Sequence, residues 1–162
     1  MKVEFISPFI EASIKAMQET VQLTPTRGQL SARPQVFTTQ QVNIVCGVTG
    51  AIDGQVIYGM SIISADKIAS IMLGSTVVTF DQVAAAAIAD LGAKMAEHSI
   101  ELLKQQGFEC RITPPTIVKG SNVKISTLDV PALVIPLEVE GIGEIEINVS
   151  VQAGNVPATA AA

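Results

Sequence analysis

One long helical segment constrains this sequence more than any other feature. Residues 82–106 contain no proline, Asp81 is a suitable N-cap in front of them, and Gly107 supplies the left-handed residue that commonly ends a helix. Only Gly92 interrupts an otherwise favourable composition. The segment therefore predicts a helix of about 25 residues, the longest element of the chain.

The periodicity of this segment predicts a helix that is buried on most of its sides. At the helical spacing, the residues of one apolar stripe are Ala84, Ile88, Leu91, Met95, His98 and Leu102, and those that line much of the rest are Ala85, Ala89, Ala96, Ile100 and Leu103. A narrow polar strip remains, made of Asp90, Lys94, Glu97, Glu101 and Lys104 with Ala86 and Ala93 among them.

Taken alone, this strip is what any helix on the surface of a folded protein needs. Asp90 and Lys94 are spaced as an ordinary i, i+4 ion pair, worth a few tenths of a kcal/mol. His98 lies at the edge of the apolar stripe and is interpreted as a packed, hydrogen-bonded histidine.

The remaining sequence predicts shorter helices and β-hairpins. Ser7 and Pro8 predict the start of a first amphipathic helix, and Ser64 predicts the N-cap of a short helix that ends at Gly74. β-Rich runs predict one hairpin over residues 42–63 and a second in "PALVIPLEVE" and "EIEINVSV", where polar and apolar residues alternate. These patterns predict an antiparallel sheet, and the repeated order of helix and strand pair suggests an internal duplication that identities do not prove.

The length and net charge of the chain limit the number of domains and the kinds of partner that are expected. A chain of 162 residues fits one domain, placed at residues 1–151, and residues 152–162 lack apolar periodicity, which predicts a flexible tail. A formal charge of −5 without any cluster of Lys or Arg argues against nucleic acid as a partner. The first residues carry charges and a proline within apolar sequence, which fits neither a signal peptide nor a membrane span, so a cytoplasmic protein is expected.

Few residues of this chain are typical of covalent or metal chemistry. Cys46 and Cys110 lie far apart inside apolar runs and are interpreted as reduced core thiols, with a disulfide or a nucleophile as the alternative. One histidine and no close cysteine pair support neither a zinc site nor a Ser/His/Asp constellation. Any chemistry must therefore depend on carboxylates and amides.

Several segments together resemble a known family. The sequences "PFIEASIKAM", "GVTGAIDGQVIYGMS", "DKIASIMLG", "AAAIADLGAKMAEHSIELLKQQG" and "ITPPTIVKG" are similar, in this order, to segments of the CheX members of the CheC/CheX/FliY phosphatase family. The resemblance implies the fold class α/β (α+β), an antiparallel β-sheet with a long helix and two shorter helices packed on it. It also implies a phosphorylated CheY-like receiver as partner and a homodimer joined through sheet edges.

In active members of this family, a helix carries a Glu and, three positions later, an Asn on the same exposed side. The acid grips the partner's conserved lysine, and the amide orients water for in-line attack on the aspartyl phosphate. The partner supplies its own Mg²⁺, so the resemblance implies no metal or cofactor site in this chain.

The resemblance places the family's Glu at Asp90 and its Asn at Ala93. The acid is one methylene shorter and the amide is absent, and no Asn occurs between Asn43 and Asn122 to replace it. We therefore expect a degenerate phosphatase site.

Four neighbouring residues are candidates for the partner-binding surface, with solvated helix charges and a rigid corner as the alternative interpretation: Lys94, Glu97, Pro114 and Pro115.

These observations favour a domain that binds a phosphorylated receiver, with weak or no phosphatase activity. Two alternatives stay open. The first is an active phosphatase in which Asp90, assisted by Glu97, handles the water. The second is a non-catalytic scaffold dimer without a receiver partner.

Overall fold

Two long hairpins form the centre of the structure. In the computed structural model, which describes residues 3–34, 37–38, 40–120, 123–124 and 130–155, β4 (Val42–Gly50) pairs with β5 (Ile52–Met60), and β9 (Ala132–Val139) pairs with β10 (Gly143–Ala153). The second strands of the two hairpins pair with each other, from Ile145 opposite Met60 to Ala153 opposite Ile52. The predicted hairpins and the antiparallel sheet are therefore confirmed.

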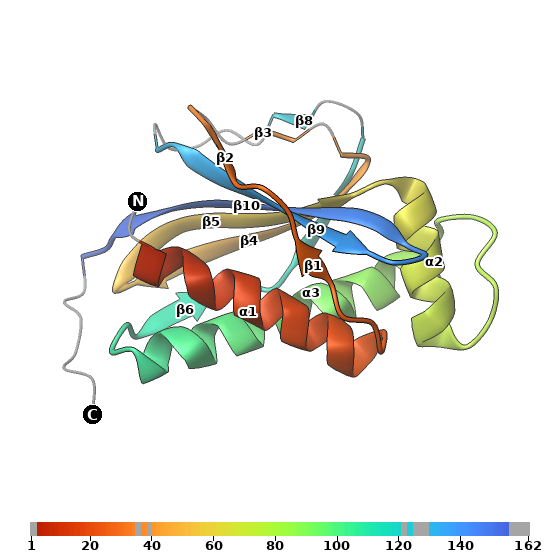
Figure 1. The fold of residues 1–162 in the computed structure, drawn as a ribbon, viewed down its shortest axis with the longest axis horizontal. Helices are drawn as coiled ribbons and strands as arrows, with labels where there is room; N and C mark the ends of the chain where they lie inside the picture. The colour runs from red at the N-terminus through yellow and green to blue at the C-terminus, as the bar shows by residue number, and fades with distance from the viewer. Residues whose placement is uncertain (1–2, 35–36, 39, 121–122, 125–129, 156–162) are drawn as a thin grey trace.

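Short strands complete the eight-stranded sheet, whose main order is β1-β9-β10-β5-β4-β6. β1 (Thr26–Arg27) and β2 (Ser31–Arg33) both pair with β9, while β6 (Cys110–Ile112) and β7 (Thr116–Lys119) both pair with β4. A separate pair, β3 (Phe37–Thr38) and β8 (Val123–Lys124), lies above the sheet in Figure 1.

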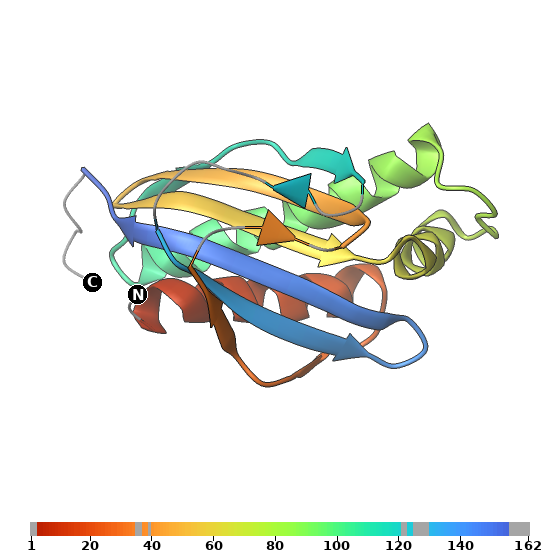
Figure 2. The same cartoon turned by 90° about the horizontal axis from the view of Figure 1, so that it is seen from above.

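The helices cover one face of this sheet. α1 (Val3–Thr20) and α3 (Gln82–Gln105) lie side by side beneath it, and α2 (Ile62–Leu73) lies at one end, as Figures 1 and 2 show. The predicted fold class is thus correct. None of these helices is long and apolar enough to cross a membrane.

The ends of α3 agree with the sequence, whereas the starts of the other two helices do not. The Asp81 carboxylate accepts a hydrogen bond from the Ala84 N–H at 2.9 Å, and Gly107 has a φ of 92° just beyond the end of α3. α2 begins earlier than predicted, because Ser61, rather than Ser64, caps it, and the Ser64 N–H donates to the Ser61 hydroxyl at 3.0 Å.

α1 begins at Val3, so Pro8 lies inside the helix instead of opening it. Phe5 and Ile6 extend the buried face of α1 by a further turn, and this burial offsets the one backbone hydrogen bond that the proline cannot donate. Apolar packing therefore outweighs the usual preference of proline for the first turn of a helix.

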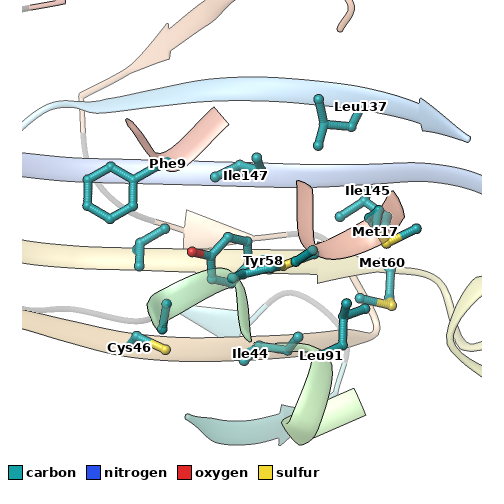
Figure 3. Packing of buried hydrophobic residues seen from close by; sticks show 14 of the residues in the cluster. Phe9, Met17, Ile44, Cys46, Tyr58, Met60, Leu91, Leu137, Ile145 and Ile147 are labelled. Atoms are coloured by element: carbon teal, nitrogen blue, oxygen red, sulfur yellow. The ribbon is translucent and has the colours of Figure 1, made fainter. Parts of the chain in front are cut away.

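A single apolar core lies between the helices and the sheet (Figure 3). It combines side chains from α1, from α3 and from each strand of the two hairpins, among them Phe9, Met17, Ile44, Tyr58, Leu91, Leu137 and Ile147. Cys46 is buried in this core as a free thiol, and burial raises the pKa of its thiol to about 11. Cys110 is also free, but it is half-buried and packs at the margin of the core, and burial raises its thiol pKa as well. The interpretation as a reduced core thiol therefore fits Cys46 fully and Cys110 in part.

The opposite face of the sheet is held by polar contacts. Arg33 Nη1 donates to Glu146 Oε1 at 3.0 Å and to Asn148 Oδ1 at 3.2 Å, and Asn148 Nδ2 donates to Glu146 Oε1 at 3.0 Å. Gln40 Nε2 lies 3.4 Å from Glu146 Oε2, so the carboxylate is shared by donors from two parts of the chain. These contacts hold Arg33 and Gln40 over the outer face of β10, where Glu146 is 6% and Asn148 0% exposed, so the polar residues of the alternating pattern are buried here.

The sheet continues into the predicted tail. β10 runs to Ala153, and the Gly154 N–H donates to the Ala51 carbonyl at 2.9 Å. Residues 156–162, the remainder of the predicted tail, lie outside the described residues.

Candidate functional site

The exposed strip of α3 has the composition and position predicted for it. Asp90, Lys94 and Glu97 are exposed, and Ala93 is half-buried between them on the same side of the helix. The opposite side of α3 packs into the core through Ile88, Leu91 and Met95. The rigid helix therefore fixes the positions of these four side chains relative to the sheet.

Three charged side chains of this strip point into solvent. No hydrogen bond or ion pair involves Asp90, Lys94 or Glu97 in the part of the chain that the structure describes. The predicted i, i+4 pair of Asp90 and Lys94 is thus absent, because both side chains are solvated instead of held together. A carboxylate and an ammonium group remain available to an incoming molecule.

The Pro114–Pro115 corner lies beside this strip because α3 packs closely on β4 at Gly92. Gly92 is buried against β4, where a Cβ atom added to it would lie 2.6 Å from Ile44 Cγ2. The same position is 3.5 Å from Pro115 Cβ, so the corner that precedes β7 lies beside the helix one residue from Ala93. Pro114 is exposed and Pro115 half-buried, so this corner contributes to the surface beside the helix strip.

The chemistry of this surface is limited by what Ala93 lacks. A methyl group neither donates nor accepts a hydrogen bond, so it cannot orient water. Asp90 supplies a carboxylate one turn before Ala93 on the same side of the helix. The surface can therefore bind a charged partner, but it presents no amide beside the acid.

His98 and the described acidic residues offer no competing site. His98 Nε2 lies 3.3 Å from Glu19 Oε2, so the histidine ties α3 to α1, in agreement with the interpretation as a packed, hydrogen-bonded side chain. No group of three or more His, Cys, Asp and Glu side chains could hold a metal ion among the described residues.

A hollow of about 820 Å³ lies at the other end of α3, lined among others by Asp53, Lys104, Glu109 and Arg111. Lys104 is about 21 Å along the helix axis from Asp90, so this hollow touches the far end of the strip and is separate from the part around Asp90 and Ala93. Its charges are of both signs and mostly exposed, which gives it no evident ligand class.

Two residues that matter for this surface were not predicted from the sequence. Gly92 was interpreted only as a weak point in a helix, whereas it allows α3 to approach β4. Val83 was not assigned to the strip, although it precedes Asp90 by seven residues, which is nearly two turns, and is exposed. The helical spacing alone could have found Val83, while the role of Gly92 depends on the packing of β4.

Comparisons with known proteins identify the class to which this fold and surface belong. The family model described as chemotaxis phosphatase CheX matches residues 42–138. The CheY-P phosphatase CheX of Thermotoga maritima is 28% identical over 155 residues, which cover 95% of this chain and 99% of that protein.

Solved structures support the same assignment. The CheX of a CheX–CheY–BeF₃–Mg²⁺ complex from Borrelia burgdorferi has a TM-score of 0.80 at 25% identity, covering 93% of this chain and 99% of the other. A CheC-like superfamily protein from Shewanella sp. PV-4 has the same fold, with a TM-score of 0.85 at 19% identity and coverage of 94% and 100%. The fold is that of the CheC and CheX proteins. Within this class, the chain belongs to the CheX family of chemotaxis phosphatases.

Substitution of Gly92 tests the close packing of α3 on β4. Gly92→Ala gains about 1 kcal/mol of helix propensity, but its Cβ must displace Ile44, which costs about 1–3 kcal/mol in a close-packed core. We expect a net loss in the free energy of unfolding, measured by urea denaturation. In an Ile44→Ala background the obstructing atoms are gone, so the same change should stabilise the protein by about 1 kcal/mol. Stabilisation in both backgrounds would contradict the close approach.

Proposed function

We propose that this chain binds a phosphorylated CheY-like receiver through the exposed strip of α3, and that its phosphatase site is degenerate. Family membership supports a role in chemotaxis signalling. The relative from Borrelia burgdorferi forms a complex with CheY in the presence of BeF₃ and Mg²⁺. The surface formed by Asp90, Ala93, Lys94 and the Pro114–Pro115 corner is the candidate for the corresponding contact here.

The main support for weak or absent phosphatase activity is the alanine at position 93. Phosphoryl transfer requires little covalent chemistry from the protein and depends on positioning and on management of charge. At the position of the water-orienting amide, this chain has the methyl group of Ala93 on a half-buried part of the strip. The retained carboxylate and ammonium groups can hold a partner, whereas the group that would place water is missing.

Charge reversal at Asp90 tests receiver binding. The BeF₃-activated receiver from the same cell should bind more tightly than the inactive receiver in calorimetry, and Asp90→Lys should weaken that complex by about tenfold, because it replaces an attraction to the partner's lysine with repulsion. Glu101→Lys is the matched control. It changes the net charge equally on the same exposed side of α3, about 16 Å further along the helix axis, and should change affinity by less than about twofold.

Equal affinity for the BeF₃-activated and the inactive receiver would contradict this proposal. Absence of binding to any receiver would leave the non-catalytic scaffold as the better explanation.

Restoring the missing groups tests the degenerate site. We expect the double change Asp90→Glu with Ala93→Asn to accelerate dephosphorylation of the bound receiver by about a hundredfold, since removal of one positioning donor costs about that factor in enzymes. Ala93→Asn alone should give part of this gain. Glu101→Asn, which places the same amide on the same side of α3 but about two turns beyond Ala93 and away from Asp90, is the control and should give none. Phosphate release is the measurement.

A wild-type rate equal to that of the double variant would favour the active phosphatase that uses Asp90 with Glu97, whose carboxylates are both exposed and unengaged. A double variant that binds the receiver and stays inert would contradict the placement of the family's motif at Asp90 and Ala93.

The resemblance also implies a homodimer, and we propose that it forms through the margins of the sheet. The long strands β4 and β9 have partners on both sides, so a dimer joined edge to edge must use the short strands β1 and β2 or β6 and β7. We expect light scattering to give a dimer mass at micromolar concentration. A monomer mass throughout that range would exclude this assembly.

A further inference from the structure

Exposed apolar side chains gather at the end of the molecule where α2 is joined to α3. Val78 is 87% exposed and Val83 59% exposed, and Ile71 and Leu73 at the end of α2 are exposed as well. We call these four residues the apolar end. Large apolar side chains that remain in water side by side commonly mark a surface that another molecule covers.

The linker between the helices is fixed in place. The Val77 N–H donates to the Ser70 hydroxyl at 2.9 Å, which holds the linker against α2, and the Asp81 N–H donates to the Thr79 carbonyl at 2.9 Å. Lys119 of β7 lies 5.9 Å from the centre of the Phe80 ring, which ties the linker to the strand that follows the Pro114–Pro115 corner. Val78 is therefore presented next to the start of α3 by a defined loop.

Val83 connects the apolar end to the strip of α3. Val83 precedes Ala86 by three residues and Asp90 by seven, so at 100° per residue all three lie on the same exposed side. Ala86 and Ala93 are small, and no charge lies between Val83 and Asp90 along this side. Towards the C-terminus of α3 the strip carries the charged residues Glu97, Glu101 and Lys104. The strip is therefore apolar on the N-terminal side of Asp90 and charged on the C-terminal side.

The strip alone is too small for a stable protein–protein interface, so the contact with the receiver must include neighbouring residues. A stable complex between globular proteins buries about 800 Å² on each partner, from about 20–30 residues. Near the site, α3 contributes a few side chains, namely Ala86, Asp90, Ala93, Lys94 and Glu97. Because the centres of interfaces are apolar and poor in charge, the surface suited to complete the contact is at Val83 and Val78.

We propose that the apolar end is the second half of the receiver-docking surface, and this inference rests on the proposed function. The receiver's aspartyl phosphate lies at Asp90 and Lys94, and an apolar patch of the receiver next to its phosphorylation site covers Val83 and Val78. The partner that fits this surface is thus a receiver with apolar side chains beside the phosphorylated aspartate. A receiver with charged side chains there is excluded, because these charges would be desolvated without partners.

The double variant Val78→Ser/Val83→Ser tests this inference without adding charge. Calorimetry with the BeF₃-activated receiver that the wild type binds should show about tenfold weaker binding, the loss expected at the centre of an interface. The heat-capacity change on binding should also become less negative, since less apolar surface is buried. Val3→Ser is the matched control, because Val3 is also a valine in the first turn of a helix, 77% exposed, at the opposite end of the molecule. It should leave both quantities unchanged.

The outcomes separate this inference from the proposed function. If Asp90→Lys weakens binding while the double serine variant binds like the wild type, the receiver docks elsewhere around the strip and only the present inference fails. If the wild type binds no receiver, both fail together. If the double serine variant instead changes a dimer to a monomer in light scattering and leaves receiver affinity intact, the apolar end is a contact between copies of this chain.

Discussion

The pairing of β5 with β10 is the interaction on which the other elements depend. Each hairpin could form locally, but neither would present a sheet wide enough to bury the apolar sides of α1 and α3. Their antiparallel pairing joins residues that are about 90 positions apart and creates one continuous face, on which Tyr58 of β5 and Ile147 of β10 stand opposite each other. The order β9-β10-β5-β4 is symmetric about this pairing, as the suggested internal duplication would produce.

In this arrangement, the residues that position the candidate site differ from the residues that determine its chemistry. The sheet and the contact between Gly92 and Ile44 fix where α3 lies, and Pro115 packs at the same point. The identities of residues 90 and 93 have little influence on that packing, because the first is exposed and the second half-buried. Substitutions at these two positions can therefore change the chemistry of the exposed strip while costing the fold almost nothing.

The sequence predicted elements where the signal is local and failed where packing decides. Asp81 and Gly107 act within one turn of the helix that they bound, so both ends of α3 were predicted correctly. The start of α1 was wrong because Phe5 and Ile6 find a core that no local signal reveals. The strip of α3 followed from periodicity alone. Its neighbours did not, because the approach of Pro115 to Gly92 joins parts of the chain that only the folded sheet brings together.

The two faces of the sheet bury different amounts of apolar surface, and this difference predicts which elements open first. Beneath the sheet, apolar burial couples α1, α3 and both hairpins, so these elements open only in global unfolding. Above it, β2 pairs with β9, and Arg33 and Gln40 donate hydrogen bonds to residues of β10, beside a small buried cluster of Ile57 and Ala132. Because this layer buries less apolar surface than the core, we expect β2 to open at a lower free energy than the core. Amide protons of β2 then exchange with solvent by local opening, without any disturbance of the strip on α3.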